Sequence, residues 1–342
     1  MLHLKFEESI RSALFFIALL CLSGVASAAD MEITPFSSSN QSPLLQIYGF
    51  PHDTGADIVP PGSFRIGLSM DTSSNYTVAK GPGELITLDG ETCRMAFTAR
   101  FGVTPNFEAG VEIPYYLQGG GFLDGFIIDW HNAFGLPQGG RDTAPKNRIN
   151  YNYRKDGVQK LLVDRSTSGI GDISLTSGLR LYDVRETDHS DSLSLKGSVK
   201  LPTGDSSYLF GSGGTDVSLQ LCGNMINYSE WGSLSVYGAI GGLAMSRSDV
   251  LRDQHKQLAG VGTLGFGWGP TSWISFKVQL NGNTSLYSDS SLDEISKNAV
   301  MIMFGGALRL PGEYLLDIGV AEDISVATAP DVSFHLGLSK RF

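Results

Sequence analysis

The chain has few cysteines and, beyond its N-terminal region, no long apolar run. Three cysteines occur in 342 residues. Cys21 lies in the N-terminal leader, and Cys93 and Cys222 are far apart, so the spacing indicates neither a disulfide framework nor a metal site. No stretch beyond the leader approaches the roughly 20 consecutive apolar residues of a membrane helix. The mature protein is therefore either soluble or crosses a membrane as strands.

Basic residues are also scarce, since 25 Lys and Arg stand against 35 Asp and Glu, for a net charge of −10. This balance argues against nucleic acid as a partner, because phosphate binding needs a basic surface. Glycine, by contrast, is abundant: 42 in 342 residues is about 12%, against a usual ~7%. Without a triplet repeat, such a composition favours many close-packed strands joined by tight turns. We expect no cofactor.

Residues 1–28 have the features of a secretory signal peptide. Lys5 and Arg11 precede an apolar run over residues 13–22, and a small-residue cleavage site ends at Ala28. Residues 29–61 then hold five prolines and few periodic apolar positions. We expect this part to be an extended N-terminal segment on the periplasmic side.

From residue 62 to 342 the apolar positions recur with a period of two. Phe64, Ile66 and Leu68, for example, alternate with Arg65 and Gly67. The pattern predicts an all-β fold, and segments of about 10–14 residues fit tilted membrane-spanning strands better than the shorter strands of a soluble sandwich. We predict a closed antiparallel transmembrane β-barrel of about twelve strands, at 62–72, 92–104, 107–117, 169–183, 191–202, 214–227, 232–246, 257–269, 272–284, 297–310, 313–323 and 331–342.

The connections between these strands alternate between short turns and long polar loops, as in bacterial outer-membrane barrels, where short turns face the periplasm. Aromatic residues lie beside the short turns, as expected of a membrane-interface girdle. The chain ends in Phe342, and its last strand resembles the C-terminal signal read by the barrel-assembly machinery, although Lys340 departs from the usual apolar residue. Outer-membrane lipid and lipopolysaccharide are further expected partners.

Five segments resemble an uncharacterised family of Gram-negative proteins, a domain of unknown function of the DUF3187 type. The most specific is the segment 122–141, FLDGFIIDWHNAFGLPQGGR, and the others are 42–50, 200–205, 213–218 and 330–335. The match spans most of the mature chain. The resemblance implies a location in the outer membrane of a Gram-negative bacterium and adds no known activity.

The long extracellular loop 118–168 is the unusual connection, because loops of this length are commonly functional. Its first half has helical spacing, and its second half predicts a hairpin that turns at Asp156-Gly157. The expected helix carries Phe122, Phe126, Trp130, His131 and Phe134.

This loop is basic: residues 141–165 hold seven cations and three aspartates, a balance of +4. Folded inward, it would plug or narrow the lumen and favour anions. Folded outward, it would bind lipopolysaccharide phosphates. The third possibility is a solvated hairpin without a ligand. The candidate constriction or anion-contact residues are Arg141, Lys146, Arg148, Arg154 and Lys155.

Twelve strands lie between the filled eight-stranded barrels and the open sixteen-stranded porins, so a constricted lumen is expected. Predicted lumen charges of both signs should pair across strands. They include Arg65, Arg94, Arg100, Glu108, Glu112, Lys196 and Lys200.

The pattern favours a narrow pore or facilitated channel for a small solute. Two alternatives stay open: an outer-membrane lipid-modifying hydrolase, and a structural or surface-binding barrel with a plugged lumen. The first alternative offers His131, with Asp124 and Asp129 nearby, or His335, near Ser333 on the last strand. His131 has no obvious nucleophile and His335 lies in the middle of a strand, so we do not expect an enzyme.

Overall fold

The computed structural model describes residues 31, 33–135, 140–324 and 328–342, apart from the side chains of Trp130, His131 and Phe134. The predicted signal peptide, 1–28, lies outside these residues. None of the helices in the described ranges is long and apolar enough to cross a membrane.

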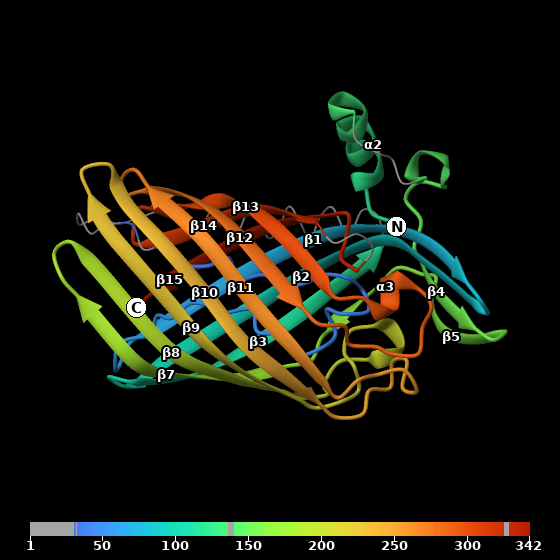
Figure 1. The fold of residues 1–342 in the computed structure, drawn as a ribbon, viewed down its shortest axis with the longest axis horizontal. Coiled ribbons are helices and arrows are strands. Elements are labelled where there is room, and N and C mark those ends of the chain that lie inside the picture. Colours follow the sequence, from blue (N-terminus) through green and yellow to red (C-terminus); the bar gives the residue numbers. More distant parts are fainter. Residues whose placement is uncertain (1–30, 32, 136–139, 325–327) are drawn as a thin grey trace.

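Twelve strands close into one antiparallel barrel (Figure 1), which confirms the predicted fold class. Closure is made by the first and last of them, with Arg65 opposite Arg341 and Met70 opposite Leu336. The wall strands are β1 (Phe64–Gly81), β2 (Glu84–Thr104), β3 (Phe107–Gly119), β7 (Ser174–Arg185), β8 (His189–Lys200), β9 (Asp216–Ser229), β10 (Gly232–Met245), β11 (Leu258–Gly269), β12 (Ile274–Asn283), β13 (Ala299–Leu310), β14 (Tyr314–Asp323) and β15 (Val332–Arg341).

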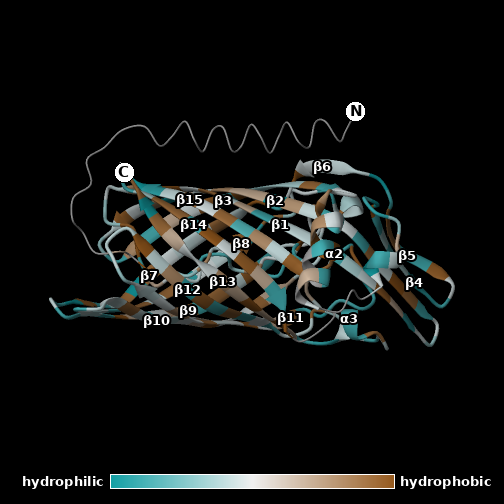
Figure 2. Cartoon of the chain, turned by 90° about the horizontal axis from the view of Figure 1, so that it is seen from above, coloured by the Kyte–Doolittle hydropathy of each residue, from teal (hydrophilic) through white to brown (hydrophobic). Residues whose placement is uncertain are grey.

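The wall is apolar outside and polar inside, and β9 shows the alternation clearly. Leu219 is 54% exposed on the outer face, whereas its neighbours Ser218 and Gln220 are 2% and 3% exposed on the inner face. Figure 2 shows the apolar residues as brown segments along the strands. This arrangement suits lipid, which offers no hydrogen bonds and therefore requires a closed sheet.

Aromatic side chains gather at the end of the barrel that carries the short turns, which we call the short-turn end. The rings of Phe64 and Phe101 lie 4.6 Å apart, and the Trp268 indole N–H donates to the Trp231 carbonyl. The amides of Phe64 and Phe342 each donate to the other residue's carbonyl across the seam. Lys340, which departs from the assembly signal, places its ammonium 5.0 Å from the centre of the Phe342 ring.

The opposite, long-loop end differs from the prediction in one respect. A loop was expected over 73–91, but β1 and β2 continue through it and turn at residues 82–83. The polar residues that suggested a loop lie in a strand pair that β4 (Asn150–Lys155) extends sideways. β5 (Val158–Val163) completes a hairpin with β4, with Asp156 and Gly157 at positive φ in the predicted turn.

The remaining elements also belong to the long-loop end. They are α2 (Leu123–Phe134), η1 (Arg141–Thr143), β6 (Thr167–Ile170), η2 (Ser206–Tyr208) and α3 (Asp293–Ser296). In Figure 1, α2 stands away from the barrel and β4 and β5 project beyond it.

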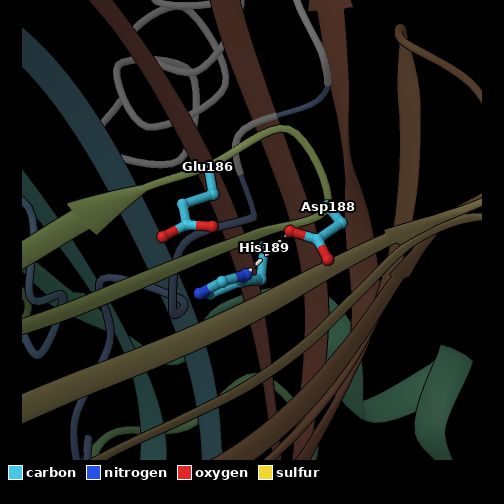
Figure 3. Close-up of side chains that lie close together, drawn as sticks. All are labelled: Glu186, Asp188 and His189. Carbon is cyan, nitrogen blue, oxygen red and sulfur yellow. Dashed lines mark hydrogen bonds and ion pairs between the residues drawn. The ribbon is translucent and has the colours of Figure 1, made fainter.

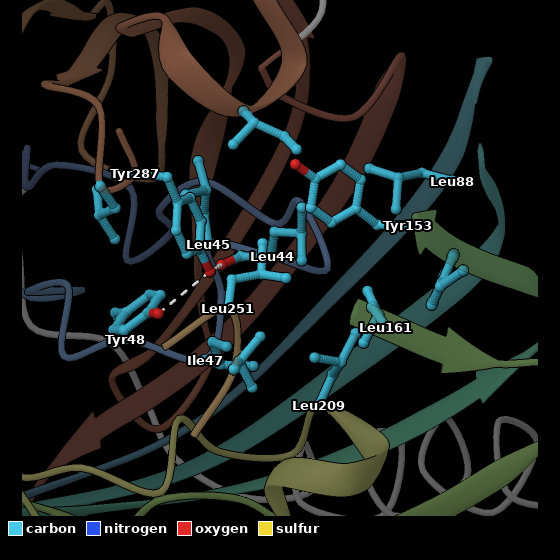
Figure 4. Packing of buried hydrophobic residues seen from close by; sticks show 14 of the residues in the cluster. Leu44, Leu45, Ile47, Tyr48, Leu88, Tyr153, Leu161, Leu209, Leu251 and Tyr287 are labelled. Carbon is cyan, nitrogen blue, oxygen red and sulfur yellow. Dashed lines mark hydrogen bonds between the residues drawn. The ribbon is translucent and has the colours of Figure 1, made fainter. Parts of the chain in front are cut away.

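An apolar cluster closes the long-loop end (Figure 4). It joins residues 44–50 of the N-terminal segment, the β4–β5 hairpin and the loops before β9, β11 and β13. Its members include Leu44, Leu45, Ile47, Tyr48, Tyr151, Tyr153, Leu161, Leu209, Leu251, Leu286, Tyr287 and Ile295. The hairpin therefore covers buried side chains at the long-loop end, and we call it the lid.

Glu84, in the part of β2 beyond the barrel, ties this lid to the loop before β13. The amide and hydroxyl of Ser291 each donate to it at 2.7 Å, and the Tyr153 hydroxyl donates at 2.8 Å. Burial acts to raise the pKa of the Glu84 carboxyl, but these hydrogen bonds outweigh it and lower the pKa from 4.5 to about 2. Ionised Glu84 therefore stabilises the lid above about pH 4.5, and this contribution is lost as the pH falls toward 2.

We predict that Glu84→Gln loosens the lid at neutral pH. Losing a charged hydrogen-bond acceptor in a buried site costs about 1–3 kcal/mol, so amide exchange over residues 285–298 should accelerate about tenfold or more. Hydrogen–deuterium exchange would measure this, with Glu294→Gln in the same loop as control. Equal protection in the two variants would contradict the assignment.

Candidate functional site: the barrel lumen

Residues 33–59 of the N-terminal segment lie inside the barrel, which differs from the expected periplasmic position of 29–61. Most of its side chains are buried, although it forms neither helix nor strand. We call residues 33–59 the lumen segment, with a first limb (33–41), a tip (42–48) and a second limb (49–59). The first limb leads from the short-turn end to the tip in the apolar cluster, and the second limb returns.

The first limb runs beside β12 in a regular register. Lys277 donates to the Thr34 carbonyl, and Gln279 both accepts from the Phe36 amide and donates to its carbonyl. Asn281 donates to the Ser38 carbonyl, and the Asn40 side chain donates to the side-chain oxygen of Asn283. Every partner pair is 243 residues apart, so alternate side chains of β12 follow a parallel limb, and those of Lys277, Gln279 and Asn281 satisfy its main chain. The ladder supplies the hydrogen bonds that the limb lacks as irregular backbone.

Apolar contacts hold the same limb at two heights. Ile33 packs with Tyr237 and Ala307, and Phe36 packs with Met303 and Ala321. A glycine of the wall leaves room for Ile33, because a Cβ on Gly267 would lie 2.4 Å from the Ile33 side chain. The first limb is therefore fixed by both apolar packing and main-chain hydrogen bonds.

Ion pairs connect the second limb to the wall, in addition to its buried residues Phe50, Ala56, Ile58 and Val59. Asp57 lies 3.0 Å from the Arg65 guanidinium and 2.9 Å from that of Arg100. Asp53 lies 2.6 Å from the Lys196 ammonium and also pairs with Arg100. The wall carboxylate Glu108 accepts from the Val59 amide at 2.7 Å and lies near both Arg100 and Lys196.

His52 connects the two limbs to the wall. Its Nε2 lies 2.9 Å from the Ser39 hydroxyl of the first limb, and its Nδ1 lies 3.2 Å from Glu112. Glu112 also pairs with Arg94, which is almost fully buried. At the top of the second limb, the Gly49 amide donates to Asp216, which pairs with Lys200.

A cavity of about 150 Å³ remains between the lumen segment and one side of the wall. Both limbs line it, together with β1, β2, β3, β7, β8, β9, β14 and β15. Its surface combines the Asp53–Asp57 ion-pair cluster with hydroxyls such as Ser69, Thr176 and Ser218. The Asp53 side chain is 42% exposed, so it is accessible from this space. The cavity has room for a few water molecules or a small polar solute.

The structure places all seven predicted lumen charges on the inner face of the wall. Each of them pairs with an opposite charge, but two of those partners, Asp53 and Asp57, belong to the lumen segment and not to a neighbouring strand. Sequence reasoning missed these two because no period marks an irregular segment. Their four-residue spacing in an otherwise uncharged stretch, 33–59, was the available signal.

The basic loop does not fold into the lumen, which corrects the inward interpretation of 118–168. Arg141 is buried between Asp124 and Asp331, and Arg148 pairs with Asp89. Lys155 pairs with Glu84, while Lys146 and Arg154 are exposed. Carboxylates of the long-loop end thus hold three of the five cations away from the cavity.

The segment predicted as a loop helix forms α2 at Leu123–Phe134. Phe122 and Phe126 are about half exposed, and the Phe126 ring lies 6.1 Å from that of Phe334. The side chains of Trp130, His131 and Phe134 lie outside the described part of the structure. The binding of lipopolysaccharide by this loop stays a prediction.

His335, the other candidate for hydrolysis, lies deep in the lumen wall. Its Nδ1 is 2.8 Å from Asp71, and the Ser38 hydroxyl donates to the same carboxylate at 2.7 Å. The serine therefore lies on the aspartate, whereas a hydrolytic triad needs it on the free nitrogen of the histidine. The arrangement joins β1, β15 and the first limb.

One group of potential metal ligands occurs in the described residues, at the turn between β7 and β8 (Figure 3). Glu186 and Asp188 are exposed there, and His189 already interacts with Asp188 at 2.9 Å. That contact raises the pKa of His189 and lowers that of Asp188, as expected of an exposed pair. The group lies apart from the lumen cavity and matches no predicted site.

The closed twelve-stranded barrel with a polar, occupied lumen defines the class: a transmembrane β-barrel of the outer-membrane type. Residues 12–342 match the family described as protein of unknown function (DUF3187), and the chain belongs to it. No curated protein sequence matches the chain.

Among solved structures, the COG4313 outer membrane channel from Pseudomonas putida F1 is similar over 86% of this chain and 100% of that chain, with a TM-score of 0.53 and 15% identity. The translocator domain of autotransporter NalP from Neisseria meningitidis matches over 84% and 91%, with a TM-score of 0.40 and 10% identity. The CymD monoaromatic hydrocarbon channel matches over 90% and 98%, at 0.35 and 12%. The likeness to the COG4313 channel shows a shared fold.

We predict that Gln279→Leu destabilises the first limb. The variant leaves the buried Phe36 amide without its acceptor, which costs about 1–3 kcal/mol. The urea midpoint of the folded, heat-modifiable form should fall, and protease should cut within residues 33–41 sooner. Gln257→Leu, at an exposed glutamine, is the control. Equal urea midpoints and equal protease sensitivity of the two variants would show that the hydrogen bonds between β12 and the first limb do not stabilise the protein.

Proposed function

We propose that the protein is a narrow outer-membrane channel whose solute path runs along the second limb of the lumen segment. The cavity between that limb and the wall carries this proposal. It is polar, it lies inside a closed barrel, and it is bordered by the part of the segment that carries Asp53 and Asp57.

The two limbs differ in how firmly they are held. The first limb combines apolar packing with hydrogen bonds to β12. Moving it would expose apolar side chains and leave main-chain groups without hydrogen-bond partners. The second limb is connected to the wall differently: Asp53 and Asp57 pair with wall cations beside the cavity, and the apolar residues Phe50, Ala56, Ile58 and Val59 are buried. Water or an anionic solute in the cavity can take the place of the two carboxylates. A shift of the second limb would therefore widen the path while the first limb stays in place.

The location rests on several independent features. The predicted signal peptide, the aromatic residues at the short-turn end and the apolar outer face all suit a protein of the outer membrane of a Gram-negative bacterium. Membership in the family supplies no activity, so the class of solute is inferred from the residues that line the lumen.

A second candidate function is a structural or surface-binding barrel with a permanently closed lumen. The observation that favours it is the lumen segment itself, which lies inside the barrel and is buried over most of its length. Mobility of the second limb distinguishes the two functions.

We predict that Ala56→Cys forms a disulfide with Cys222 and locks the second limb. The two positions pack in one buried cluster, and Cys222 is a free thiol in the native chain. In planar bilayers, the oxidised variant should open rarely, and dithiothreitol should restore the openings of the wild type. Mass spectrometry would confirm the cross-link.

The wild-type chain under the same oxidant is the matched control, because it has Cys222 without a partner beside it. Restored conductance on reduction supports a channel with a movable limb. A folded protein without openings in either redox state would end the channel proposal and favour the closed barrel.

A further inference from the structure

Three arginines lie side by side on the inner face at the seam. Arg65 on β1 is directly opposite Arg341 on β15 and directly opposite Arg100 on β2. Directly opposite residues of antiparallel strands share a face, and like charges in that position repel. Lys196 on β8 faces the same cluster through its shared partner Asp53. The wall therefore concentrates positive charge at one level of the lumen.

The carboxylates of the lumen segment compensate this charge. Around Arg100, the wall residues in ion-pair contact with the second limb or with each other are three cations, Arg65, Arg100 and Lys196, and one anion, Glu108, a balance of +2. Arg341, opposite Arg65, adds a further positive charge at this level. Asp53 and Asp57 supply −2, so the second limb compensates most of the positive charge of the wall here.

The geometry points to an anion site on the wall, formed by Arg65, Arg100 and Lys196, that takes a small dicarboxylate. In this inference, Asp53 and Asp57 occupy the site as intramolecular substitutes for the two carboxylates of the solute. It rests on the proposed channel and names the class of solute for the same cavity.

Three features of the site select two carboxylates over one. A single guanidinium, Arg100, contacts both Asp53 and Asp57, and each carboxylate has a second cation of its own, Lys196 or Arg65. Guanidinium groups match carboxylates in shape and charge. The second limb brings two negative charges to these cations, so a monoanion would replace only half of them.

The site also has an entrance. The cavity reaches Asp53, Asp57, Arg65, Arg100 and Lys196, so a solute in it contacts the cations and their present partners together. A dicarboxylate that displaces Asp53 and Asp57 releases the ion pairs that hold the second limb. Binding and widening of the path then become one event, because the solute competes with the limb for the same cations.

The test uses the full-length chain and malonate as the probe. In the wild type, the two aspartates compete with malonate, and the apparent affinity is reduced by the small fraction of free sites. Asp53→Asn with Asp57→Asn removes the competitors. We expect this variant to bind malonate about tenfold or more tightly than the wild type in calorimetric titrations at constant ionic strength, and acetate to bind far more weakly.

Two further variants on the same background locate the site. Arg100→Gln should abolish the gained malonate binding, whereas Lys277→Gln should leave it unchanged. Lys277 is a matched control because it is a buried lumen cation whose carboxylate partner, Asp317, belongs to the wall. Equal malonate affinity of the wild type and the double aspartate variant would overturn the inference, as would binding that survives Arg100→Gln.

Bilayer recordings on the same proteins separate this inference from the channel itself. Malonate binding without channel openings would support the dicarboxylate site and contradict the proposed channel function. Openings without malonate binding, or without anion selectivity in the double aspartate variant, would retain the channel and end the site. Should the double variant fail to fold, Asp53→Asn alone tests the same point, because Asp57 still compensates Arg65 and the expected gain is only smaller.

Discussion

Charge compensation inside a closed wall is the constraint on which the interior depends. Lipid outside forces polar side chains inward, and ions there have little water to screen them, so each needs a partner. The wall meets part of this need itself, as in the Lys200 cluster with Asp172 and Asp216. Around Arg100 it does not, and an irregular segment completes the balance.

The two limbs of the lumen segment differ in function in our proposal: the first limb stays fixed, and the second limb can shift. Along β12, the side chains of Lys277, Gln279 and Asn281, at every second position, form hydrogen bonds with the main chain of the first limb, much as a neighbouring strand would. The second limb meets the wall through long basic side chains, which can follow a displaced carboxylate. The difference lies in the wall residues that face each limb.

Much of the barrel could be predicted because the period-two pattern of residues such as Val217 to Cys222 is set directly by lipid and lumen. The extension of β1 and β2 could not, since Thr72 to Thr77 are polar on both faces and are buried only by elements distant in sequence. The lumen segment was missed for a related reason: its partners, from Asp71 to His335, are spread over the chain. The periodicity of a sequence reflects the surroundings of one strand, whereas the conformation of the lumen segment depends on contacts with the closed barrel.

The position of the lumen segment directly before β1 bears on assembly. Its first limb hydrogen-bonds with β12, contacts His335 of β15 and donates from Ser38 to Asp71 of β1, so its partners come together only when β15 meets β1. Residues that precede every strand in the chain therefore reach their native surroundings last. A chain truncated before its final strand would leave the first limb without part of its contacts, a feature that distinguishes unfinished barrels from finished ones.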